Sequence, residues 1–482
     1  MAENEADTLP HYFVDTPHFA KIIKGETGLF VGRKGAGKTA CLLAAREELA
    51  HHADNLVAVI SPTGAEMSAL LEFISTYDDA AQRHALDALW EFLLMTEVGA
   101  TLRRHLERLS LLSGANAAQR DFIEFVDDAD VSLDADFTVR LETALGRLQE
   151  RISGQLSHEE FRGKLTQALH QVYLSELRRK IGSASPAKLN AYILIDNLDA
   201  SWDSSTNVAE MSRVLLALLE ASRKIRLSFA KSSSRLESVN VSVAVFLRTD
   251  ILDAIKRVAG EVDKLPISEL VWRDPNALAH IPEQRYLYAD QSAEAGTELW
   301  SRYFVDRVDG QATREYILNS VLPRPRDIVM FCRTALDAAL SSQHERILAE
   351  DVIAAEGHYS EFALDRLLVE GRLEIPDLEE LILCFLERDA VMTIDGVRDA
   401  LTESGLDEDS HADAIEKLLR LEFLGVSQAG DRLMFPASER DVKKALVLVR
   451  RALETGQQVS LGVHPAYHSV LAISRPPMVT AP

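Results

Sequence analysis

Residues 28–49, GLFVGRKGAGKTACLLAAREEL, contain the stretch that decides the fold. Residues 28–32 predict a short buried strand, and the residues from Lys38 onward carry apolar side chains at helical spacing. Between them, Gly32 to Thr39 fit the pattern G-x-x-x-x-G-K-[ST]. Glycines let the backbone curl so that successive N–H groups point inward, a conformation that side chains obstruct. The stretch therefore predicts a strand, an anion-wrapping loop and a helix, which together begin an α/β sheet.

The loop also predicts a nucleotide-binding site. Because the helix N-terminus adds partial positive charge, the loop suits the phosphates of ATP. Lys38 would reach the β- and γ-phosphates, and the Thr39 hydroxyl would ligate Mg²⁺. We therefore predict ATP and Mg²⁺ as cofactors. The residues expected to contact the nucleotide are Gly32, Arg33, Lys34, Gly35, Ala36, Gly37, Lys38, Thr39 and Ala40.

A carboxylate that would complete the metal site follows another buried strand. In residues 191–203, AYILIDNLDASWD, an apolar run ends at Asp196, and ligands of open α/β sheets bind at the carboxyl ends of strands. Asp196 is therefore expected to hold Mg²⁺ together with Thr39. Asp199 is the nearest further carboxylate able to orient an attacking water, and Asp203 is a weaker candidate. Asp is also a common helix cap, and that alternative stays open for Asp199.

Two further segments contain arginines that could sense the nucleotide. Residues 241–250, VSVAVFLRTD, predict a strand that ends at Arg248, and this residue would stand beside the γ-phosphate if its strand neighbours the strand of the metal-binding carboxylate. Capping of the next helix by this polar end is the alternative. Arg326 follows a proline-marked turn, VLPRPRD, into an apolar helix, and an arginine fork pairs well with phosphate oxygens. Arg324 is an alternative donor.

Composition limits the class of protein. The chain has 482 residues, 47% of them hydrophobic, and 52 Lys and Arg against 75 Asp and Glu give a net charge of −23, which opposes non-specific attraction to nucleic acid. No apolar run approaches the roughly 20 residues of a membrane helix, and the acidic N-terminus is unlike a signal peptide, so we expect a cytoplasmic protein without membrane contact. Cys41, Cys332 and Cys384 lie far apart among apolar residues, which predicts buried thiols.

Strand and helix patterns divide the chain into five parts. After the strand predicted at 56–62 the pattern is nearly all helical for more than a hundred residues, which indicates an insertion that contacts a partner or simply packs its own helices. The predicted parts are an α/β P-loop core with a parallel sheet (1–63 and 190–275), the helical insertion (64–189), a helical lid (276–370), a winged-helix-like domain (371–440) and a C-terminal helix and tail (441–482).

Three short helices and a hairpin signal, DRLMFP, underlie the winged-helix prediction. The third helix argues against duplex DNA as its partner, because acidic residues dominate its outward positions. These positions are Asp413, Glu416 and Glu422, against Lys417 and Arg420. The basic, serine-rich residues 223–238 predict a solvated loop, with contact to nucleic acid or an acidic partner as the alternative. Protein contact is therefore favoured over nucleic acid.

The motifs GRKGAGKTA, IDNLDASWD, FLRTD, DKLPISELVW and PRPRDIV together resemble a family of bacterial P-loop ATPases. That family is related to the origin-recognition, KAP and STAND branches of AAA+-like proteins, and its members often occur near phage-defence genes. The resemblance implies an AAA+-like sheet, ATP hydrolysis, and the sensor 1 and sensor 2 positions for Arg248 and Arg326. Because an arginine of one subunit often completes the next subunit's site in such rings, it also implies a homo-oligomer. The chain departs from the pattern at Asn197, where many AAA+ ATPases have the glutamate that polarises the water, so Asp199 would take that task.

Three functions fit these observations. The first is a regulatory ATPase whose nucleotide state controls assembly or a partner effector encoded nearby, in bacterial anti-phage defence. The second is a DNA-binding ATPase of the initiator or loader type, and the third is a scaffold that nucleotide stabilises without turnover. The sequence has no nuclease, protease or deaminase constellation, so under the first hypothesis the destructive chemistry belongs to another protein. The residues expected to carry hydrolysis are Lys38, Asp196, Asp199, Arg248 and Arg326.

Overall fold

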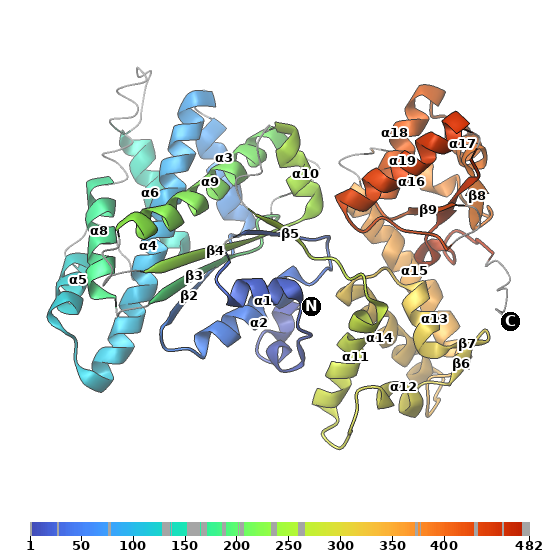
Figure 1. Cartoon of the computed structure of the whole chain (residues 1–482), viewed down its shortest axis with the longest axis horizontal. Helices are drawn as coiled ribbons and strands as arrows, with labels where there is room; N and C mark the ends of the chain where they lie inside the picture. The colour runs from blue at the N-terminus through green and yellow to red at the C-terminus, as the bar shows by residue number, and fades with distance from the viewer. Residues whose placement is uncertain are drawn as a thin grey trace. The chain divides into compact units, whose positions relative to one another are not determined.

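The computed structural model of the chain divides into two compact units (Figure 1). The first comprises Met1–Pro10, Asp15–Arg33 and Lys38–Leu270, and the second comprises His11–Val14, Lys34–Gly37 and Val271–Pro482. No helix in the described part of the chain is long and apolar enough to cross a membrane. The structure describes all residues except 1, 27, 76–78, 128–134, 136, 152–163, 165–170, 186–188, 201, 203–206, 233–238, 259–265, 372–374, 376, 429–431, 456 and 475–482.

A five-stranded parallel sheet organises the first unit, which confirms the predicted fold class. The strands follow the order β2-β3-β4-β1-β5. Because β4 lies between β1 and β3, the segments that follow these three strands leave the sheet at the same edge. The strand of Arg248 is therefore a neighbour of the strand of Asp196, as the sensor position requires. The strand bounds are β1 (Gly28–Val31), β2 (Asn55–Ile60), β3 (Asn190–Ile195), β4 (Asn240–Leu247) and β5 (Ile267–Glu269).

Helices cover both faces of this sheet. The helices α1 and α2 lie on one side, and α9 and α10 lie on the other (Figure 1). The described part of the predicted insertion consists of α3, α4, α5, α6 and α8. The helix bounds are α1 (Pro17–Ile23), α2 (Lys38–Ala50), α3 (Gly64–Ser75), α4 (Asp79–Ser113), α5 (Ala117–Asp127), α6 (Phe137–Arg151), α8 (Gln171–Ala184), α9 (Val208–Ser232) and α10 (Thr249–Val258).

The insertion shares its hydrophobic core with the sheet. Helix α4 packs against α9 and β2, and the indole N–H of Trp90 donates to the Val214 carbonyl at 3.1 Å. The first part of the basic segment 223–238 differs from the prediction of a loop, because α9 extends through it to Ser232. Of the cysteines, Cys41 is buried as predicted, whereas Cys332 and Cys384 are only half-buried.

The second unit begins with a helical region. Its hydrophobic core continues without interruption into the C-terminal region of the same unit. A short antiparallel hairpin, β6 (Arg307–Val308) with β7 (Gln311–Ala312), interrupts the helices. The helix bounds are α11 (Pro275–Ala289), α12 (Glu298–Tyr303), α13 (Thr313–Ser320), α14 (Pro325–Ser341) and α15 (Ala349–Gly371).

The C-terminal region combines helices with a three-stranded antiparallel sheet of order β8-β10-β9. Its elements are α16 (Leu378–Leu383), β8 (Val391–Thr393), α17 (Ile394–Glu403), α18 (His411–Arg420), β9 (Leu424–Gln428), α19 (Glu439–Thr455) and β10 (Val459–Val463). The predicted hairpin forms at a single residue pair. Met434 forms an isolated bridge with Val426, and the strand that pairs along β9 is β10, which follows α19. The domain therefore continues past the boundary predicted at residue 440.

Candidate active site

The phosphate-loop motif joins β1 to α2, as the sequence predicts. Gly35 and Gly37 have φ values of +91° and +95°, which L side chains rarely adopt, so the backbone itself demands glycine at both positions. The backbone N–H of Gly32 donates to the Leu247 carbonyl of β4 at 3.1 Å, which fixes the start of the loop to the sheet. The loop thus has the local geometry that the motif requires.

Lys38, the first residue of α2, places its ammonium against the beginning of the loop. Its Nζ donates to the carbonyl oxygens of Gly32 at 2.9 Å and Arg33 at 3.1 Å. Burial lowers the pKa of Lys38, whereas the carboxylates of Asp199 and Asp196 oppose this shift. The ammonium is therefore held by loop carbonyls and lies within electrostatic range of both predicted acidic residues.

Thr39 and Asp196 meet across the edge of the sheet. The Thr39 Oγ1 donates to Asp196 Oδ2 at 2.7 Å, although 157 positions separate the two residues in the chain. Burial raises the pKa of the Asp196 carboxyl, and the hydrogen bond from Thr39 opposes that shift. A hydroxyl and a carboxylate side by side are hard oxygen donors of the kind that Mg²⁺ prefers. The two residues fit the predicted metal site.

Asn197 takes a structural position after β3. Its φ of +62° lies in the left-handed region, which Asn tolerates better than most residues, and its Nδ2 donates to the Pro62 carbonyl at 3.0 Å. Its side chain is thus bound to the segment after β2. An amide cannot act as the acidic base that many AAA+ ATPases have at this position.

Asp199 points to the candidate site and does not cap the following helix. Its Oδ2 accepts a bond from Arg248 Nη1 at 3.4 Å, and the side chain is 30% exposed. The N-cap of α9 is instead Asn207, whose Oδ1 accepts from the backbone N–H groups of Ala209 and Glu210. The capping alternative is therefore wrong for Asp199. The other candidate, Asp203, lies outside the described residues.

Arg248 is a buried partner of two carboxylates. It is 6% exposed, and besides Asp199 it binds Asp250 through Nε at 3.0 Å and Nη2 at 2.5 Å. The bidentate pair with Asp250 fixes the plane of the guanidinium. The structure therefore brings together Lys38, Thr39, Asp196, Asp199 and Arg248 in the first unit.

Arg324 and Arg326 belong to the second unit, as do the loop residues Lys34–Gly37. Within this unit the backbone N–H of Arg326 lies 3.4 Å from the Gly35 carbonyl oxygen. Arg324 is 6% exposed and pairs with Glu370 at 3.2 Å and Glu422 at 3.0 Å. Burial opposes its charge, but the two carboxylates outweigh burial and raise the pKa of Arg324. This side chain therefore has internal ion-pair partners.

Glu422 corrects the prediction for the third helix of the C-terminal domain. The sequence placed it at an outward position, yet it is 3% exposed. It follows the end of α18 with a φ of +59°, and this turn lets its side chain reach Arg324. The local helical pattern ended before this residue, so helical periodicity could not locate its side chain.

Sequence reasoning assigned no role to three further residues. Asp250 orients Arg248, and its position two residues after a strand-ending arginine was a usable signal. Trp272 donates its indole N–H to the Ala36 carbonyl at 3.0 Å within the second unit, a contact without a local sequence signal. Trp202 is buried, and its indole N–H has no acceptor among the described residues.

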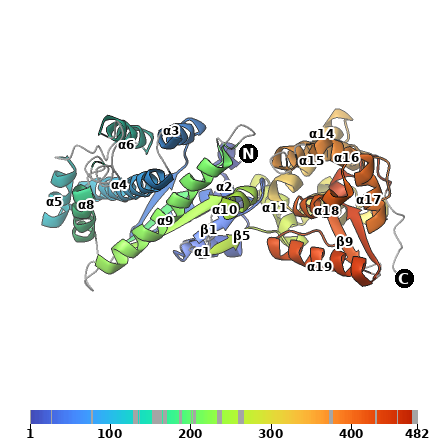
Figure 2. The same ribbon diagram turned by 90° about the horizontal axis from the view of Figure 1, so that it is seen from above.

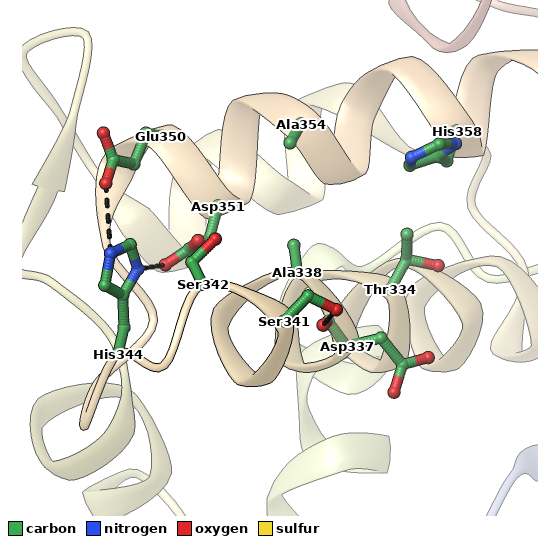
Figure 3. Close-up of a pocket in the computed structure, with 10 residues that line it drawn as sticks. All are labelled: Thr334, Asp337, Ala338, Ser341, Ser342, His344, Glu350, Asp351, Ala354 and His358. Atoms are coloured by element: carbon green, nitrogen blue, oxygen red, sulfur yellow. Dashed lines mark hydrogen bonds and ion pairs between the residues drawn. The ribbon is translucent and has the colours of Figure 1, made fainter.

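A cavity of about 590 Å³ lies between α14 and α15, and no predicted site residue is among the residues that line it (Figure 3). His344 stands between two carboxylates there, with Nδ1 at 2.8 Å from Asp351 Oδ2 and Nε2 at 3.3 Å from Glu350 Oε1. Asp351 also accepts from the backbone N–H of Leu348 at 2.8 Å. These bonds close the turn between α14 and α15. His344, Glu350 and Asp351 therefore have a structural role at this turn.

Comparison with known proteins gives a family match for one part of the chain. Residues 278–368 match the FunZ-associated C-terminal helical domain. This range lies within the predicted lid and contains α12, α13 and α14 in full. A protein of Escherichia coli (strain K12), named for transposon gamma-delta and of 80.3 kDa, is 20% identical over 426 residues. The match covers 82% of this chain, which spans about half, 54%, of that relative's length.

Solved structures give weaker likenesses. The ORC2 protein of Aeropyrum pernix, in ADPNP-ADP complexes, is 10% identical with a TM-score of 0.31, and the match covers 94% of this chain and 95% of that one. The RuvB Holliday junction branch migration motor of Thermotoga maritima is 13% identical with a TM-score of 0.30, covering 92% and 94%. Cdc6p of Pyrobaculum aerophilum is 11% identical with a TM-score of 0.30, covering 92% and 97%. The functional assignment therefore rests on the site itself.

Proposed function

We propose that this chain is an ATPase that binds ATP with Mg²⁺ at its phosphate loop and hydrolyses it. The contact between Thr39 Oγ1 and Asp196 Oδ2 carries the proposal, because at 2.7 Å it joins the end of the loop motif to the residue that follows β3. Lys38, Asp199 and Arg248 gather at the same edge. This is the set of charges that phosphoryl transfer to water requires.

Each residue has a distinct task in the proposed reaction. Lys38 would exchange its loop carbonyl acceptors for phosphate oxygens, which form stronger, charge-assisted hydrogen bonds. Thr39 and Asp196 would hold Mg²⁺, which neutralises phosphate charge when bound. Asp199 would accept the proton of the attacking water, because it is the partly exposed carboxylate of the group. Arg248 keeps Asp199 in place through the bond from its Nη1.

The nucleotide state would control assembly of copies of the chain or the action of a partner effector. Arg326 supports this proposal, because it stands in the first turn of α14 and its backbone contacts Gly35 within the second unit. The motif resemblance supports a homo-oligomer and a place in bacterial anti-phage defence with an effector encoded nearby. Under this proposal the effector, and not this chain, carries the destructive reaction.

Calorimetric titration of ATP with Mg²⁺ into the wild-type chain and into Lys38→Ala tests the proposal. Loss of the charge-assisted contact should weaken ATP affinity by roughly ten- to a hundredfold, because such a contact contributes about 1.5–3 kcal/mol. Lys256→Ala, an exposed change in the last turn of α10, is the matched control and should bind as the wild type does. Undiminished affinity in Lys38→Ala would refute the assignment of this loop.

The place in defence needs a separate test. Cells that carry this gene with its genomic neighbours should resist phage infection, whereas the same genes with Lys38→Ala should lose that protection. Equal plaque counts with and without the genes would remove the defence role and leave the ATPase assignment untouched.

A further inference from the structure

Helix α19 follows the segment DRLMFP and lies where the sequence predicted a C-terminal helix. It stands between β9 and β10 in the chain and packs against α18 and both strands. Its buried side chains, which include Val442, Ala445 and Val449, form a continuous inner face. Figure 2 shows α19 along one edge of the second unit, on the side away from α14 and α15. The opposite face of α19 is therefore open to solvent.

That open face is basic, although the chain as a whole is strongly acidic. At 3.6 residues per turn its cationic residues fall within an arc of about 120°, over a length of about 16 Å. We call this surface the basic stripe. Its members are Arg440, Lys443, Lys444, Arg450 and Arg451. All are exposed, with Lys443 at 72% and Lys444 at 58% of the side chain.

Most of this positive charge is not neutralised within the chain. Over the described residues, no hydrogen bond or ion pair involves the side chains of Arg440, Arg450 or Arg451. Lys443 lies 3.8 Å from Glu439, and Lys444 lies 3.5 Å from Asp441. At these lengths, and with both ammonium groups exposed, the pairs contribute little free energy, and the lysines can exchange them for another anion.

The neighbouring helix α18 shows the opposite arrangement. Its Lys417 pairs with Asp413 at 2.8 Å, and its Arg420 pairs with Glu416 at 2.8 Å and with Glu439 at 2.5 Å. Both cations of α18 are thus already bound to carboxylates. The exposed cations of α19 are therefore the better candidates for binding an anion.

We propose that the basic stripe of α19 binds the sugar-phosphate backbone of duplex DNA. Duplex DNA presents one negative charge per about 1.7 Å of its axis, so a 16 Å stripe would face roughly nine phosphates. Such a density suits five clustered cations, and guanidinium groups pair well with phosphate oxygens. The net charge of −23 repels DNA from the rest of the chain, which would restrict binding to this face.

Fluorescence anisotropy with a labelled 30-base-pair duplex of mixed sequence tests this proposal over a series of salt concentrations. Arg450→Gln/Arg451→Gln removes two cations of the stripe. Each lost phosphate contact should reduce the salt slope by about one, so affinity at 0.1 M salt should fall roughly ten- to a hundredfold. Lys256→Gln/Arg257→Gln on α10 changes the net charge equally and is the control. It should bind DNA as the wild type does.

Two further measurements separate this surface from the ATP site and from self-association. Lys38→Ala should retain DNA binding without nucleotide, because the stripe does not include the phosphate loop. Lys443→Gln/Lys444→Gln should repeat the loss seen with the arginine pair, which guards against a local folding defect in one variant. Wild-type DNA affinity in both stripe variants would overturn the proposal. A second result would also overturn it: no duplex binding at 50 mM salt, together with a lower molecular mass of the stripe variants in light scattering. The stripe would then join copies of the chain.

Discussion

Arg248 holds Asp199 across the ends of the structure's central strands, with 3.4 Å between Nη1 and Oδ2. The same guanidinium is fixed by a bidentate pair with Asp250. These contacts support the proposal that Arg248 positions the carboxylate that orients water.

Asp199→Asn should retain ATP binding and slow hydrolysis. General-base assistance typically contributes 10²–10⁴-fold, and an amide cannot accept the proton of water. Steady-state phosphate release and calorimetric ATP binding measure the two effects separately. Asp196→Asn should instead weaken the Mg²⁺ dependence of binding, because its carboxylate is a proposed metal ligand. Asp253→Asn on α10 is the control, and turnover of Asp199→Asn at the wild-type rate would exclude the role of base.

The parts of the fold that local patterns encode were predictable. Apolar runs located the strands before Lys38, Asp196 and Arg248, and the glycine motif located the loop, because each signal lies within about ten residues. The pairing of Arg324 with Glu422 was not predictable, since the two lie 98 positions apart and meet through tertiary packing.

The C-terminal domain shows a second limit of local patterns. A helix was expected after residue 440, and the structure contains it as α19. The sequence did not indicate that the chain would return from this helix as β10 and pair along β9. Strand pairing across an intervening helix depends on which apolar face the whole domain must cover. The nearer segment DRLMFP therefore pairs with β9 only at Met434.

Arg324→Met should destabilise the second unit by about 3–5 kcal/mol, because it leaves the buried carboxylates of Glu370 and Glu422 without a counter-charge. Hydrogen exchange of peptides from α14, α15 and α18 should accelerate, whereas peptides of the first unit should not change. Neutralising all three residues, in Arg324→Met/Glu370→Gln/Glu422→Gln, should restore much of the protection. Arg333→Met, an exposed change on the same helix, is the control. Unaltered exchange in the single variant would show that the pairs are dispensable.

Asp327 should make the second unit less stable as pH rises from about 4 to 6. Burial raises the pKa of its carboxyl from 3.8 to about 6, so the folded chain binds a proton that the unfolded chain has released in this interval. The shift corresponds to about 3 kcal/mol, which the folded state loses as the pH passes the raised pKa.

The variant Asp327→Asn tests this dependence on pH. In the wild type the Tyr359 hydroxyl donates to Asp327 Oδ1 at 2.8 Å, and the amide oxygen of Asn keeps an acceptor for it while removing the titration. The melting temperature of Asp327→Asn minus that of the wild type should be near zero at pH 4 and positive above pH 6. A difference that does not vary with pH would contradict this assignment.

ATP with Mg²⁺ should change the oligomeric mass of the chain, and Arg326→Ala should weaken that response. Arg326 stands in the first turn of α14, and its backbone contacts Gly35, so its guanidinium is suited to report a phosphate to the helical region. The loop, Lys38 and Thr39 remain in the variant, so much of the ATP affinity should survive. Light scattering of the apo, ADP and non-hydrolysable ATP-analogue states measures the mass, and calorimetry measures the affinity.

The control is Arg333→Ala, an exposed change further along the same helix, which should behave as the wild type does. An identical mass in all three states of the wild type would contradict control of assembly by nucleotide, and duplex DNA binding that depends on ATP would then favour a DNA-handling ATPase.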